Sequence, residues 1–276
     1  MKIFIIGLGL MGASYAEGLT RQGHQVFGYD YHSNIMEHAM RLGIISKESD
    51  LKKIGDADLV ILALYPNDNV KFVKLYQNFF KKGQMVTDLS GTKAIMMHEI
   101  ECALPKGVSY TSHHPMAGKE KNGFESRDHH MFKDANFLIV TGRRSTLGDQ
   151  DTLRKIAKEL KFGKISVVDA HMHDALVAYT SQLTHVLAVS LVQSDHMALT
   201  KIATGDSFRD LTRIAKINED MWSELFLENK EQLIIKINDF MKELKHIKEL
   251  ILFEDQDSLK SYLKEAKEKR KSFDSD

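Results

Sequence analysis

The sequence predicts an α/β protein, with an N-terminal Rossmann-type doubly wound sheet followed by an all-α C-terminal domain. Three observations lead to this fold class. Short β-branched runs alternate with helical periodicity in the first half of the 276-residue chain, a glycine-rich turn follows the first run, and strand patterns stop at about Asp169. Strands that alternate with helices form parallel sheets covered on both faces, so we expect a nucleotide-binding domain at residues 1–169 and a helical domain at 170–276.

Seven segments have the composition of strands, and helical stretches separate the first of them. Helices are expected at residues 11–23 and 33–43. The strands are expected at residues 2–7, 25–30, 57–64, 84–90, 108–114, 135–142 and 164–169.

The second half of the chain has helical patterns. Residues 173–193 are apolar nearly all round, which predicts a buried helix. A long amphipathic helix is predicted further on, and its apolar seam must pack against its own domain or against a second copy of the chain. The seam consists of Phe226, Leu233, Ile237, Phe240, Leu244, Ile247 and Ile251.

Charge and cysteine content limit the class of partner. The chain has 38 Lys and Arg and 38 Asp and Glu, so no net field attracts nucleic acid or an anionic membrane, and a small ligand is favoured. The single cysteine, Cys102, excludes an intramolecular disulfide framework and is typical of a cytoplasmic protein. The apolar run before Gly7 is too short for a signal peptide or a membrane span.

The first strand runs into a G-x-G-x-x-G pattern formed by Gly7, Gly9 and Gly12. In this position glycines allow a tight turn and let the amides of the next helix approach a pyrophosphate. Asp30 ends the second strand, where a carboxylate accepts hydrogen bonds from an adenosine ribose and repels a 2′-phosphate. The pattern predicts NAD as the cofactor, and no metal site is predicted. The predicted cofactor-binding residues are Gly7, Gly9, Leu10, Met11, Gly12, Asp30 and Leu64.

The segment TSHHPMAGKE places two adjacent histidines before a proline. Pro115 forces His114 into an extended backbone, and the end of a parallel strand is where open α/β sheets bind ligands. His113 and His114 must point to opposite faces because strand side chains alternate. Only one of the two histidines can therefore face the cofactor.

Four segments together give a family resemblance. HPMAGKEKNGF, DLSGTK, HDALVAYTSQLTHVLA and FRDLTRIAKINEDMWSELFLENK resemble the prephenate dehydrogenase family of tyrosine biosynthesis, from Lys2 to about Ile251. The resemblance implies an enzyme that removes hydride from a cyclohexadiene dicarboxylate, transfers it to NAD and releases carbon dioxide. It also implies a stand-alone catalytic unit. The apolar seam, if it does not pack within its own domain, is expected to form a homodimer through the helical domain.

The resemblance implies roles for particular residues. His114 matches the catalytic histidine, which would take the proton of the substrate hydroxyl, a role suited to a group with a pKa near 6.5. Arg213 matches the arginine that binds a substrate carboxylate, with Asp210 and Trp222 at the family's spacing around it; we interpret Trp222 as core. Further substrate-binding residues implied by the resemblance are Glu120, Ser181 and His185.

The chain departs from the family pattern at two places. Gln182 and Thr184 replace the usual histidine and proline of the motif here written SQLTH. Gly91 stands where many relatives have a serine that holds the substrate hydroxyl, so Ser90 or Thr92 is predicted to take that role.

Three other functions compete with prephenate dehydrogenase. Arogenate dehydrogenase performs the same chemistry on a substrate with an amino acid side chain. A β-hydroxyacid dehydrogenase shares the glycine motif, but the helix YTSQLTHVLAVSL does not contain that family's lysine. A non-catalytic NAD-binding regulator would keep the fold without turnover.

Overall fold

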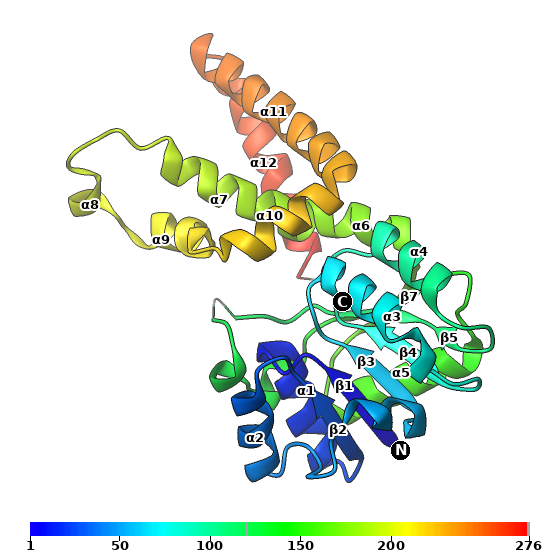
Figure 1. Ribbon diagram of the computed structural model, residues 1–276. Coiled ribbons are helices and arrows are strands. Elements are labelled where there is room, and N and C mark those ends of the chain that lie inside the picture. The colour runs from blue at the N-terminus through cyan, green and yellow to red at the C-terminus, as the bar shows by residue number, and fades with distance from the viewer. Residues whose placement is uncertain (120, 275–276) are drawn as a thin grey trace. The chain divides into compact units, whose positions relative to one another are not determined.

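A computed structural model describes residues 1–119 and 121–274. Its N-terminal part contains a five-stranded parallel sheet in the order β2-β1-β3-β4-β5 (Figure 1). A second sheet has the order β6-β7-β8, in which β6 and β7 are antiparallel. The strands are β1 Lys2–Ile6, β2 Gln25–Tyr29, β3 Leu59–Leu62, β4 Met85–Asp88, β5 Ser109–Tyr110, β6 Ser112–Pro115, β7 Phe137–Thr141 and β8 Ile165–Asp169.

Helices cover both faces of the five-stranded sheet, which confirms the doubly wound class. Alternate residues of β1 face opposite ways: Ile3 and Ile5 pack against α1 and α5, whereas Phe4 and Ile6 pack against α3 and α4. Every position from Ile3 to Ile6 is fully buried. The helices of this part are α1 Leu10–Arg21, α2 Ser33–Arg41, α3 Pro66–Leu75, α4 Ala94–Ala103 and α5 Leu147–Glu159.

The single strand expected at residues 108–114 is two strands in two different sheets. β5 continues parallel to β4, while β6 pairs antiparallel with β7. Asp149 of α5 stabilises the break between them, because its carboxylate accepts hydrogen bonds from Ser109 Oγ at 2.8 Å and Thr111 Oγ1 at 3.0 Å. His113 and His114 therefore lie on a strand of the second sheet and not on the five-stranded parallel sheet.

The apolar segment predicted as a buried helix is helical throughout but mostly unburied within the chain. It comprises α6 Ala170–Val177, a π-helical segment Ala178–Gln182 and α7 Leu183–Gln193. Residues 170–193 form a helix long and apolar enough to cross a membrane by length and composition, and 28% of the apolar window is buried. The prediction of burial was wrong for the single chain, because Leu176 and Tyr179 are exposed.

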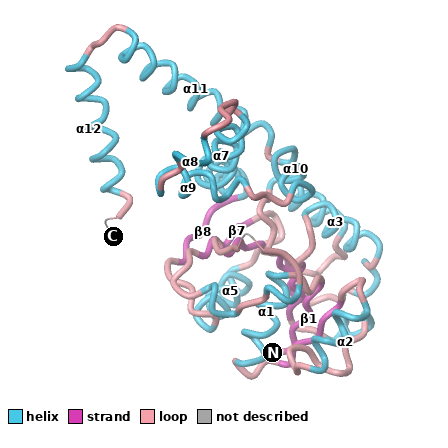
Figure 2. Tube along the Cα trace, turned by 90° about the vertical axis from the view of Figure 1, so that its left-hand side faces the viewer, coloured by secondary structure: helices cyan, strands magenta, loops and turns pink. Residues whose placement is uncertain are grey.

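The predicted long amphipathic helix is two helices in the structure. It is interrupted at Asn229, so Phe226 belongs to α10 and the rest of the seam to α11. Compact packing divides the chain into residues 1–229 and 230–276, and the second unit is a helical hairpin (Figure 2). The α-helices after α7 are α8 Thr200–Ala203, α9 Asp206–Thr212, α10 Glu219–Glu228, α11 Lys230–Leu252 and α12 Gln256–Ser272.

Candidate active site

The glycine loop between β1 and α1 has the geometry of a pyrophosphate site. Gly7 has a positive φ of 92°, and a Cβ there would lie 2.7 Å from the carbonyl oxygen of Ala63. A Cβ on Gly12 would clash with the carbonyl oxygen of Gly7, whereas a Cβ on Gly9 would meet no atom within 4 Å. The loop is therefore tight where the helix packs and open where a phosphate would approach. Leu10 and Met11 form the first turn of α1.

Asp30 lies beside this loop at the end of β2. Its carboxylate accepts the backbone N–H of Leu8 at 2.9 Å and that of His32 at 3.0 Å, one on each oxygen. Each oxygen keeps acceptor capacity for a ribose hydroxyl. Leu64 lies on the other side of the loop, where its Cδ2 would be 2.8 Å from a Cβ on Gly7. The predicted cofactor residues are thus together around one loop.

His113 is a structural histidine in the core. Its Nε2 lies 3.0 Å from the Tyr15 hydroxyl and its Nδ1 lies 2.7 Å from Thr87 Oγ1, while the ring stacks on Phe137. Burial, helped by a nearby ammonium group, lowers the pKa of His113 to about 3. Tyr15 belongs to the helix that starts at the glycine loop. These contacts therefore fix β6 next to α1, the helix that starts at the glycine loop.

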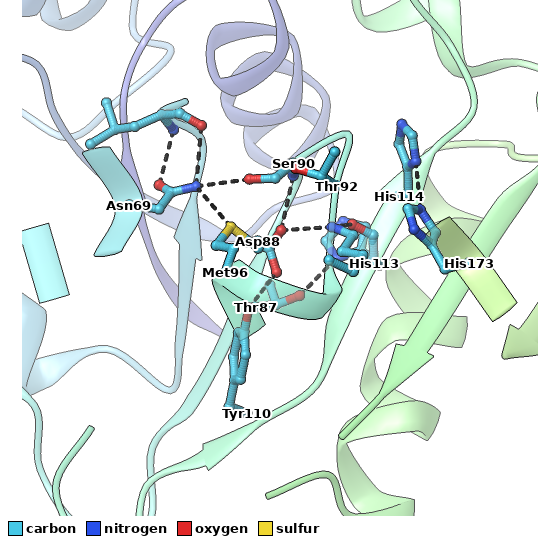
Figure 3. Close-up of polar contacts among 12 residues, drawn as sticks. Asn69, Thr87, Asp88, Ser90, Thr92, Met96, Tyr110, His113, His114 and His173 are labelled. Carbon is cyan, nitrogen blue, oxygen red and sulfur yellow. Dashed lines mark hydrogen bonds and ion pairs between the residues drawn. The ribbon is translucent and has the colours of Figure 1, made fainter. Parts of the chain in front are cut away.

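His114 points to the opposite side and joins a chain of hydrogen bonds (Figure 3). Its Nδ1 lies 2.8 Å from His173 Nε2, and His173 Nδ1 lies 2.8 Å from Asp174 Oδ1. The Asp174 carboxylate also accepts the backbone N–H groups of Lys93 and Ala94 at the start of α4. Burial lowers the pKa of His114 well below its usual range, and His173 and Lys93 act in the same direction. The ring is therefore neutral at neutral pH.

A buried ion pair holds the loop that carries residues 88–93. Lys93 Nζ lies 2.6 Å from Asp88 Oδ1 and donates to the carbonyl oxygen of His113 at 2.9 Å. The Tyr110 hydroxyl donates to the other oxygen of Asp88. Burial raises the pKa of Asp88, but the Lys93 ammonium and the hydrogen bonds outweigh it and the net shift is downward. Removing either partner would leave an unpaired charge in the core.

The two hydroxyls predicted to hold the substrate hydroxyl have partners elsewhere. Ser90 Oγ accepts a hydrogen bond from Asn69 Nδ2 at 3.0 Å, and Thr92 donates to Glu228 Oε2 at 2.5 Å. Within the described residues, neither hydroxyl is within hydrogen-bonding distance of His114. The Ser90 hydroxyl can still donate a hydrogen bond, whereas the Thr92 hydroxyl already donates its hydrogen bond to Glu228.

Gly91 lies between these residues and has room for a side chain. A Cβ at this position would lie 3.4 Å from Leu225 Cδ2 and 3.6 Å from Cδ1, which is ordinary van der Waals contact. A Cβ at position 91 would therefore fit without moving the backbone.

The other predicted substrate residues gather around α7. His185 Nδ1 donates to the carbonyl oxygen of Ser181 at 2.9 Å, and its ring stacks on Trp222 with centroids 3.7 Å apart. Arg213 begins a short 3₁₀ helix that packs against α7. Glu120 lies outside the described residues. The structure thus brings His185, Ser181 and Arg213 to one helix, while His114 is joined to the start of that same helical run through His173.

Sequence reasoning did not single out His173 or Asp174, and it interpreted Trp222 as core. The adjacent pair of an imidazole and a carboxylate at the start of an apolar helix was the available signal, because such polar groups are costly to bury without partners. Trp222 is half-buried and packs its ring on His185, a predicted substrate residue.

The glycine loop, the acid at the end of β2 and the neutral histidine of β6 define a nicotinamide-dependent dehydrogenase of the Rossmann class. Residues 15–167 match the description "Prephenate dehydrogenase, nucleotide-binding domain", and residues 169–265 match "Prephenate dehydrogenase, dimerization domain". The chain belongs to the prephenate dehydrogenase family.

Individual relatives agree with this assignment. The chain is 32% identical to the prephenate dehydrogenase of Lactococcus lactis, covering 99% of this chain and 77% of that protein. It is 26% identical to the cyclohexadienyl dehydrogenase of Zymomonas mobilis, covering 99% and 96%. A crystal structure of Aquifex aeolicus prephenate dehydrogenase with hydroxyphenyl propionate and NAD+ superposes with a TM-score of 0.89 at 29% identity, covering 99% and 98%. The nucleotide-binding match and the NAD+ in that relative support NAD as the cofactor.

Proposed function

We propose that this protein catalyses the NAD-dependent oxidative decarboxylation of prephenate to 4-hydroxyphenylpyruvate. The observation that carries the proposal is the position of His114. His114 is half-buried near the end of β6, and its Nδ1 lies within hydrogen-bonding distance of His173. The neighbouring His113 contacts Tyr15 and so joins β6 to α1, the helix that starts at the glycine loop. A base on β6 is therefore suited to take a proton from a hydroxyl presented to a nicotinamide bound at that loop.

The residues divide the chemistry among them. The O–H bond of the substrate breaks as His114 Nε2 takes the proton, and the carbinol carbon loses hydride. Bound NAD supplies the hydride acceptor. The ring carboxylate then leaves as carbon dioxide, and the phenolate recovers the proton from His114, so the base is regenerated. Because the pKa of His114 is lowered, the base form persists below the ordinary histidine range.

Substrate positioning is proposed for the residues around α7 and the 88–93 loop. Arg213 would bind a carboxylate through its forked donors, with His185, Ser181 and Glu120 near the same ligand. Of the two residues, Ser90 is the better candidate to bind the substrate hydroxyl, because the Thr92 hydroxyl already donates its hydrogen bond to Glu228.

Asp30 supports NAD rather than NADP as the cofactor of this reaction. Both of its oxygens are fixed by backbone amides, so the carboxylate cannot turn away from the ribose. A 2′-phosphate would meet this negative charge at close range.

We also propose a cytoplasmic homodimer, with the chain divided into domains at residues 169 and 170. This division is the junction of β8 and α6, and it lies within two residues of the boundary between the two family matches, which cover residues 15–167 and 169–265. Apolar side chains exposed on one chain would be covered by a second copy, and no nucleic acid or membrane partner is proposed. They include Leu191, Val192, Met197, Leu199, Ile202 and Leu211.

Parallel assays of NADH formation with prephenate and with arogenate test the proposed function. We expect turnover with NAD and prephenate, with a higher kcat/KM than for arogenate. A higher kcat/KM for arogenate would make the protein an arogenate dehydrogenase with the same chemistry. NAD binding without turnover of either substrate would contradict the proposal.

A further inference from the structure

The hydrogen-bond chain from His114 through His173 to Asp174 has a fixed direction. We infer that His173 and Asp174 are positioning residues that hold His114 with its proton on Nδ1 and its lone pair on Nε2. The inference rests on the proposed function only for the role of the Nε2 lone pair, which is to accept the proton of the substrate hydroxyl. The tautomer itself follows from the contacts of these three residues.

The direction is set at the Asp174 end. The carboxylate accepts the backbone N–H groups of Lys93 at 2.9 Å and Ala94 at 2.8 Å, so it acts as an acceptor for both and caps the start of α4. The same Oδ1 that accepts from Lys93 lies 2.8 Å from His173 Nδ1. His173 Nδ1 must therefore carry a proton, since a lone pair there would face a carboxylate oxygen.

The proton on His173 Nδ1 fixes the other histidine. A neutral His173 has its lone pair on Nε2, and this atom lies 2.8 Å from His114 Nδ1. Burial lowers the pKa of His173, which keeps that ring neutral. His114 must then donate from Nδ1, and its Nε2, which points away from His173 in Figure 3, carries the lone pair.

The arrangement is rigid enough to select one tautomer. His173 is fully buried. Asn229 Nδ2 donates to the carbonyl oxygen of Asp174 at 2.9 Å, which holds the backbone of the pair. When His114 takes a proton on Nε2, its Nδ1–H becomes a charge-assisted donor to His173. This bond to a neutral His173 stabilises the imidazolium, whereas burial, a positive charge on His173 and the ammonium of Lys93 all lower the pKa of His114.

The test measures the tautomer and the rate separately. Long-range ¹H–¹⁵N NMR of the ¹⁵N-histidine-labelled protein, with NAD bound, reports which ring nitrogen of His114 carries the proton. The signals of His114 are assigned by their absence in His114→Asn. The variants are His173→Phe, which removes the acceptor, and His173→Gln, whose amide oxygen can still accept. His171→Phe, two residues earlier on the same helix and exposed, is the matched control.

We expect Nδ1–H on His114 in the wild type, in His173→Gln and in His171→Phe, and a mixture of tautomers in His173→Phe. The kcat of His173→Phe should fall at least about tenfold with little change in KM, and His173→Gln should recover most of it. A wild-type His114 protonated on Nε2 would overturn the inference, as would full activity and an unchanged tautomer in His173→Phe. An Nδ1–H tautomer in a protein that turns over neither substrate would support the inference while the proposed function failed.

Discussion

At the scale of single residues, the two histidines of β6 show how neighbours acquire different roles. His113 is enclosed by Tyr15, Thr87 and Phe137, so it holds the strand in place. His114 contacts His173 through Nδ1, and its Nε2 is the atom proposed to take the proton of the substrate hydroxyl. Alternation along the strand and the restriction imposed by Pro115 predicted this separation from the sequence, since both effects are local.

Gly91 offers a residue-scale prediction. Gly91→Ser should fold normally, because the added Cβ would be in ordinary contact with Leu225. Its hydroxyl should lower the KM for prephenate by about two- to tenfold, the effect of one neutral hydrogen bond. Gly91→Ala is the matched control, since it adds the same Cβ without a hydroxyl. Equal KM values for the two variants would show that position 91 does not contact the substrate.

At the scale of elements, buried amides tie α10 to the helical run that begins with α6. Asn229 Nδ2 donates to the carbonyl oxygen of Asp174 at 2.9 Å and to Gln182 Oε1 at 2.8 Å. Gln182 in turn donates to the carbonyl oxygen of Leu225 at 2.9 Å. Gln182 replaces the histidine that the family pattern has at this position, so here an amide connects the two helices.

Asn229→Ala should therefore destabilise the protein. It would leave two buried acceptors without their donor, at a cost of about 2 kcal/mol in the free energy of unfolding. Urea denaturation measures the change. Asn238→Ala, at an exposed position of α11, is the control and should stay within about 0.5 kcal/mol of wild type. Equal losses in the two variants would exclude a structural role for the amide network.

Element-scale features were harder to predict than local ones. Periodicity predicted the strands and helices of the nucleotide-binding part, because burial on both sheet faces leaves a clear pattern. The break at Asn229 and the split of residues 108–114 depend on contacts with distant residues such as Asp149 and Asp174. The hydrogen bond between His114 and His173 joins residues 59 positions apart, so no local pattern contained it.

At the scale of the whole molecule, buried neutral histidines link stability to pH. The pKa values of His113, His114 and His173 are all lowered by burial. The unfolded chain binds protons at these groups below about pH 6.5, whereas the folded chain does not, so stability must fall as the pH falls. The slope is at most about 1.4 kcal/mol per pH unit for each histidine.

Between pH 6.5 and 5 we therefore expect the free energy of unfolding to decrease, in a range where most carboxylates are still ionised. Denaturation at several pH values measures the slope. In His113→Gln the free energy of unfolding should change less steeply with pH, by up to about 1.4 kcal/mol per pH unit, because one titrating histidine is removed. A stability that is constant or increases as the pH falls from 6.5 to 5 would contradict the burial of these three rings in neutral form.

The central claim is that His114 takes the proton of the substrate hydroxyl. The most direct measurement is the turnover of His114→Asn with saturating NAD and prephenate, together with its dissociation constant for NAD. We predict unchanged NAD binding and a kcat lower by about two to four orders of magnitude, the usual effect of losing a general base. A kcat within about tenfold of wild type would contradict the claim and remove His114 from the chemistry.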